Sequence, residues 1–89
     1  MIALPAELMH AQASACLQAL LRGLESEPSE QVVVDAAALQ RFDSSALAVL
    51  LELRRQCLAT GKGLAISGLP SRLRDLASLY GIGELLPGA

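Results

Sequence analysis

Asp43, Ser44 and Ser45 are the residues of this sequence best suited to chemistry. They stand directly before a long apolar pattern with helical spacing, which begins at Ala46. Aspartate is a preferred N-cap, because its side chain accepts hydrogen bonds from the unpaired amides of the first helical turn. Ser44 would then lie in that turn, where the helix dipole tolerates an added phosphate. The simplest interpretation is a helix cap alone; the alternative is a site for modification or docking.

No catalytic set of residues accompanies these hydroxyls. Ser44 would act as a nucleophile only beside an activating base, and the sequence spacing offers none. His10 is the only histidine and is predicted to be a surface residue at a helix start, without a serine or cysteine partner. The nine carboxylates are scattered without metal-ligand spacing, and Gly61-Lys62-Gly63 is a turn rather than a phosphate-binding loop. The sequence therefore predicts no enzyme, no metal site and no cofactor.

Composition limits the class of protein. A chain of 89 residues forms one domain, here residues 1–89. Because 53% of the residues are hydrophobic and only 2% aromatic, the core must be aliphatic, and some aliphatic surface should remain for a protein partner. The net charge of −2 does not suggest the positively charged surface that nucleic-acid binding requires.

The N-terminus lacks the pattern of a signal peptide, and the longest apolar run, residues 46–51, is far shorter than the ~20 residues of a membrane span. A cytoplasmic domain is expected.

The elements that would position these residues alternate along the chain. The pattern predicts strands over residues 2–8, 31–35 and 64–67, and helices over residues 10–24, 44–60 and 71–80. Pro5 favours an edge position for the first strand. The three consecutive valines of the second strand suit a central strand covered on both faces. This alternation is typical of an α/β domain with largely parallel pairing.

Apolar positions define the faces that these elements should bury. Leu39 and Phe42 are expected to pack inward from the connector before the second helix. Cys16 and Cys57 fall within helices and are interpreted as small core residues rather than a disulfide or metal pair. The buried face of the first helix is predicted to comprise Ala13, Cys16, Leu17, Leu20, Leu21 and Leu24, and that of the third helix Leu73, Leu76, Ala77 and Tyr80.

The helix over residues 44–60 carries more apolar surface than one core face needs. Two leucine stripes lie roughly a quarter turn apart, with Arg54 between them. One interpretation buries both stripes and lets Arg54 extend outward along the surface. The other makes the side formed by Ser44, Ala48 and Arg55 a docking surface, where small residues let a partner approach closely.

The stretch Arg41-Phe42-Asp43-Ser44-Ser45-Ala46-Leu47, after a strand that ends at Asp35, resembles the STAS domain family. The motif usually has glycine where this chain has Ala46, and residues 61–68 resemble the family's next turn and strand. The resemblance spans residues 2–87 and implies a single small STAS-like α/β domain, with a mostly parallel short sheet and flanking helices. The chain begins where the family's second strand begins, so either the first strand is missing or the start codon has been assigned too late. A missing first strand would expose a sheet edge, through which a homodimer is possible.

Two branches of the family give two hypotheses. The favoured one is the MlaB-like STAS subunit of Mla-type phospholipid ABC transporters, because the chain ends soon after a segment like residues 76–82 and Leu85-Leu86-Pro87. It implies a non-catalytic cytoplasmic adaptor, peripheral to the inner membrane, that binds the transporter's ATPase through Ser44 with Asp43, Ser45, Ala48 and Arg55. The alternative is an anti-sigma factor antagonist, in which a partner kinase phosphorylates the first serine of the motif, here Ser44.

Overall fold

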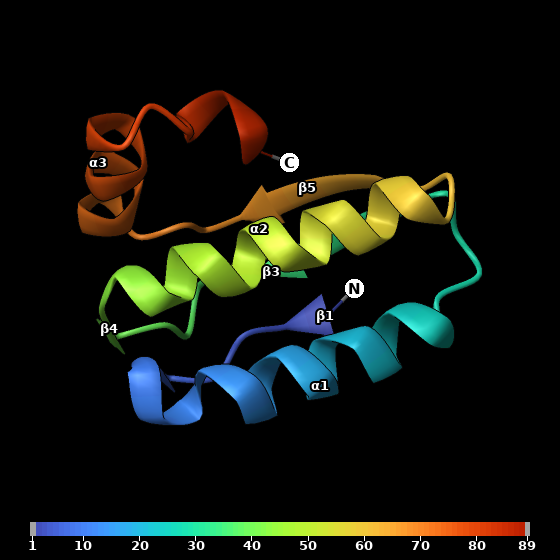
Figure 1. Cartoon of the computed structure of the whole chain (residues 1–89), viewed down its shortest axis with the longest axis horizontal. Coiled ribbons are helices and arrows are strands. Elements are labelled where there is room, and N and C mark those ends of the chain that lie inside the picture. The colour runs from blue at the N-terminus through green and yellow to red at the C-terminus, as the bar shows by residue number, and fades with distance from the viewer. Residues whose placement is uncertain (1, 89) are drawn as a thin grey trace.

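Two parallel five-residue strands form the centre of the fold. The computed structural model describes residues 2–88 (Figure 1). β3 (Gln31–Asp35) and β5 (Gly63–Ser67) pair in parallel, with Gln31 opposite Gly63 and Asp35 opposite Ser67. β1 (Ile2–Ala3) pairs in parallel with the other side of β3, which gives the strand order β1-β3-β5. The predicted α/β domain with parallel pairing is confirmed.

β3 is the central strand of this sheet, as the valine run predicts, but its two faces are not equally covered. Val32 and Val34 are fully buried, whereas Val33, on the opposite face, is only half-buried. Both long helices lie over the same side of the sheet (Figure 1). The predicted cover is therefore confirmed on the face of Val32 and Val34 and is only partial on the other face, where Ala65, paired with Val33, is buried. Three β-branched residues in a row favour a strand but do not say how fully each of its faces is packed.

The N-terminal segment forms two short strands instead of the single strand predicted over residues 2–8. β1 ends at Ala3, and β2 (Glu7–Leu8) pairs in parallel with β4 (Arg41–Phe42) to form a separate two-stranded sheet. Pro5 lies between them and has no N–H to donate, so it interrupts the strand. The edge position is confirmed: no strand within residues 2–88 covers the outer side of β1.

The helices follow their predicted ranges closely. A 3-10 turn, η1 (His10–Gln12), leads into α1 (Ala13–Glu25). The other helices are α2 (Ser44–Ala59), α3 (Ser71–Leu79) and the 3-10 turn η2 (Gly83–Leu85). Gly61 ends α2 with a φ of +74°, a left-handed conformation that costs glycine little.

The core is aliphatic and centres on α2. Leu50, Leu53 and Cys57 of this helix are completely buried. The predicted inner face of α1 packs against the same core, and both cysteines are free thiols. Tyr80 is an exception, because 57% of it is exposed where the helical period predicts burial. No helix within residues 2–88 is long and apolar enough to cross a membrane.

Candidate docking site at the start of α2

Asp43 holds the start of α2 in place. Its backbone is extended, as an N-cap requires, and its Oδ1 accepts a hydrogen bond from the Ser45 amide at 2.8 Å. Its Oδ2 accepts a second bond from the amide of His10, at 3.1 Å, which ties η1 to α2. Donation by the Ser45 amide, with a smaller contribution from His10, lowers the pKa of the Asp43 carboxyl below its ordinary value. The predicted cap is confirmed, and it also joins two elements.

His10 lies beside the motif, which the sequence did not predict. Its Nδ1 is 3.5 Å from the Ser45 hydroxyl, although 35 positions separate the two residues. The prediction that His10 is exposed is confirmed, but the expectation that it has no serine partner is wrong. The Asp43 carboxylate bonds the main-chain amide of His10 rather than its ring, so it does not orient the imidazole as a catalytic triad would. The arrangement supports the helix start.

Ser44 and Ala48 form the exposed part of this helix start. Both are exposed, whereas Ala46 and Leu47 between them are buried. A shallow groove of about 270 Å³ runs beside Ala48 between α1 and α2. Its lining comprises His10, Ala13, Ser14, Leu17, Ser45, Ala48 and Val49. These small and aliphatic side chains leave room for a partner element to approach the two helices closely.

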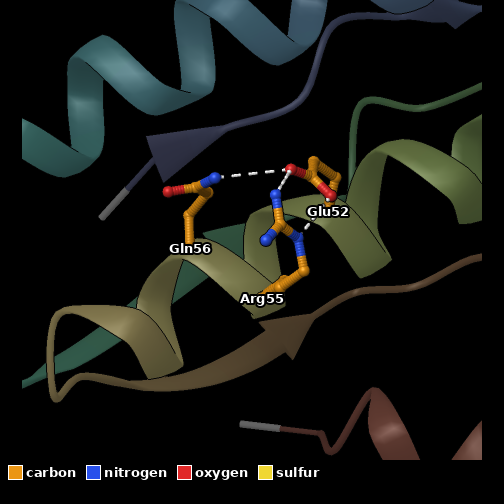
Figure 2. A network of polar contacts seen from close by, with 3 residues as sticks. All are labelled: Glu52, Arg55 and Gln56. Carbon is orange, nitrogen blue, oxygen red and sulfur yellow. Dashed lines mark hydrogen bonds and ion pairs between the residues drawn. The ribbon is translucent and has the colours of Figure 1, made fainter.

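Arg55 lies on the same helix, two turns beyond Ala48, and is held by an intrahelical ion pair (Figure 2). Its Nε and Nη2 donate to the two oxygens of Glu52 at 3.0 and 2.6 Å, and Gln56 donates to the same carboxylate at 3.4 Å. Donation by Arg55, and then by Gln56, lowers the pKa of Glu52. The guanidinium is thus partly neutralised and fixed in orientation before any partner binds.

The structure therefore brings four of the five predicted site residues together. Asp43, Ser44, Ser45 and Ala48 occupy the first turns of α2, and Arg55 extends the same side about 10 Å along the helix axis. We call these five residues the α2 surface. Within residues 2–88, no three or more His, Cys, Asp or Glu side chains are grouped to hold a metal ion.

The Asp43 cap makes stability depend on pH. Because the pKa of Asp43 is lowered by folding, its ionised form stabilises the domain above the ordinary carboxyl pKa, about 4, and this contribution is lost as the pH falls through the lowered value. Asp43→Asn keeps an oxygen that can cap but removes the charge. We expect the melting temperature of the wild type to fall more steeply than that of Asp43→Asn between about pH 5 and pH 2, as followed by circular dichroism.

The control for this measurement is Asp75→Asn. Asp75 is an exposed carboxylate that accepts no hydrogen bond within residues 2–88. This variant should follow the wild-type curve. Parallel curves for the wild type and Asp43→Asn would contradict the assigned role of the carboxylate.

Comparison with protein families gives one result. The family model described as "Mlab, STAS domain" matches residues 1–87. No curated protein matches the chain. STAS domains are generally non-catalytic modules that bind other proteins, which suggests an adaptor role here. With nearly the whole sequence matched, three helices over a parallel sheet and the Asp-Ser-Ser helix start, the chain belongs to the STAS domain family, in its MlaB-like form.

Proposed function

We propose that this protein is a non-catalytic adaptor that binds and stabilises the ATPase of a phospholipid-transport ABC transporter. The observation that carries the proposal is the α2 surface, which exposes Ser44 and Ala48 at the start of the helix that forms the centre of the core. An MlaB-like domain with such a surface can rigidly present it to a partner. The ATPase would hold the protein at the cytoplasmic face of the inner membrane.

The chemistry of the α2 surface suits protein recognition. Its centre consists of small side chains, so a partner helix can approach the backbone closely. The hydrogen bonds of Asp43 and the ion pair of Arg55 fix the surrounding polar groups before binding, which reduces the conformational entropy lost on association. Partner contacts would then cluster around Ser44 and Ala48.

Copurification from the native host tests this function. The tagged wild type should recover an ABC-transporter ATPase that mass spectrometry identifies. Ser44→Asp adds a charge at the centre of the surface but suits a helix N-terminus, so it should fold normally and recover at least about tenfold less ATPase.

The control is Ser29→Asp, in the loop at the opposite end of the domain (Figure 1). It adds the same charge and should leave recovery unchanged. Absence of an ATPase from the wild-type sample, or equal recovery with Ser44→Asp, would contradict the proposal.

A second candidate function is an anti-sigma factor antagonist controlled by phosphorylation of Ser44. The observation that favours it is the exposure of Ser44 in the first turn of α2, where the positive end of the helix dipole favours an anion. Incubation with ATP and a cognate anti-sigma kinase would add one phosphate to the wild type and none to Ser44→Ala, as read by intact mass. An unchanged mass for the wild type would exclude this function.

The free side of β1 supports self-association in addition to ATPase binding. The Leu4 amide donates a hydrogen bond to the Asp35 carbonyl of β3 at 2.8 Å. Because successive amides of a strand point to opposite sides, the Ala3 amide points away from β3. Pro5 is the next residue whose amide would point away from β3, but it has no N–H to donate, so the edge open to pairing is short.

Sedimentation equilibrium should show a concentration-dependent dimer for the wild type and a monomer for Ala3→Lys. A wild type that stays monomeric at all concentrations would rule out this dimer.

A further inference from the structure

A second groove lies beside the α2 surface, between β4 and α3. Its volume is about 390 Å³, and its lining comprises Phe42, Arg72, Asp75, Leu76 and Leu79. Phe42 directly precedes Asp43, so one lining residue of the groove is next to the α2 surface in the sequence. Figure 1 shows α3 at the same end of the molecule as the start of α2.

The outer side of α3 carries two leucines that the domain does not fully bury. Leu79 is 79% exposed, and Leu76 is half-buried on the same side. Arg72, Leu76 and Leu79 are spaced four and three residues apart, so they align along one face of the helix, while Leu73 and Ala77 fill the core from another. On this side of α3 the domain covers Leu76 only in part and leaves Leu79 exposed, and Tyr80 adds exposed aromatic surface at the end of the helix.

Arg72 gives this groove an unsatisfied positive charge. Its guanidinium carbon lies 5.2 Å from the centroid of the Phe42 ring, a cation–π contact that holds the side chain over the groove. Within residues 2–88 it forms no ion pair, even with Asp75 one turn away on the same helix. Arginine preferentially binds carboxylates with two parallel hydrogen bonds, so Arg72 is available to an acidic group from outside.

The lining of the groove itself carries one basic and one acidic side chain, Arg72 and Asp75. Because no ion pair joins the two within residues 2–88, the Arg72 guanidinium can accept a carboxylate from a partner. A partner segment that reaches Arg72 is therefore favoured when it carries an acidic side chain there.

We propose that the groove between β4 and α3 binds an amphipathic, acidic segment of the same ATPase, with its apolar side chains against Phe42, Leu76 and Leu79 and a carboxylate on Arg72. This inference rests on the proposed function, because it extends the α2 surface to a second contact with one partner. The apolar stripe supplies desolvated contact area, and the Arg72 pair selects the register of the segment.

The test uses the ATPase that copurifies with the wild type, purified and titrated against each variant. Arg72→Glu should weaken binding at least about tenfold, and the loss should shrink as the salt concentration rises. Leu79→Asp should have an effect of similar size. Both positions are exposed, so both variants should melt at the temperature of the wild type.

Arg74→Glu is the matched control. It makes the same charge change on the same helix, but Arg74 is about 200° around the helix from Arg72 and does not line the groove. Its affinity should stay within about twofold of the wild-type value, because an exposed charge away from the contact contributes little. If Arg72→Glu and Leu79→Asp bind like the wild type while Ser44→Asp does not, the second contact is wrong and the α2 surface stands. If the wild type binds no ATPase, both proposals fail.

Discussion

Replacing Ala48 with arginine should lower the affinity of the protein for the proposed ATPase partner by at least about a hundredfold. Ala48 is exposed one turn after Ser44, at the centre of the α2 surface. A long charged side chain there would hold a partner away from the backbone and leave a buried, unpaired charge in the interface. The fold should be unaffected, because arginine is a good helix former and the position faces solvent. Calorimetric titration of the purified ATPase measures the change.

Ala15→Arg is the control for this variant. Ala15 is likewise an exposed alanine inside a long helix, but it lies on α1 and outside the α2 surface. We expect it to bind the ATPase with wild-type affinity. If Ala48→Arg and Ala15→Arg bind equally well, the partner does not contact the start of α2.

Replacing Leu50 with alanine should destabilise the domain by about 3 kcal/mol. Leu50 is completely buried where α2 crosses the core, and truncation removes both its transfer free energy and the contacts around the resulting cavity. A loss of this size is a large part of the ~5–10 kcal/mol expected for a small domain. Urea denaturation should show a lower midpoint with an unchanged slope.

Leu58→Ala is the control, because it makes the same change on the same helix at a residue that is 56% exposed. It should cost less than about 1 kcal/mol, since little apolar area is lost and alanine favours the helix. Equal losses for the two variants would mean that α2 does not form the centre of the core.

The parts of the fold that could be predicted from sequence are those with local signals. The start of α2 was predictable because an N-cap acts within one helical turn, and its end because Gly61 adopts a conformation that few other residues tolerate. Ala46 replaces the usual glycine of the motif without disturbing the helix, and its methyl group is fully buried in the core. Two of the three strands of the main sheet were found within a residue of their ends for the same reason.

The remainder depends on contacts between distant segments. The pairing of β2 with β4 involves two residues on each strand, too few to show a period. The contact of His10 with Asp43 and Ser45 joins residues more than 30 positions apart, so spacing gives no sign of it. Tyr80 falls at the next apolar position in the helical spacing of α3, but it is the C-cap residue of that helix. Because the helix ends there, the Tyr80 side chain lies outside the core.

Amide chemical shifts of the labelled protein, recorded with and without the purified ATPase, test the central claim most directly. A chain of 89 residues allows each amide to be assigned. We predict that the ATPase shifts or broadens the amides of Asp43, Ser44, Ser45, Ala48 and Arg55 at low saturation, before the rest of the protein responds. Amides of β1 at the opposite edge of the sheet should keep their positions. The proposed docking site would be contradicted if the ATPase binds elsewhere on the domain and leaves the amides of the α2 surface unchanged, or if the ATPase does not bind.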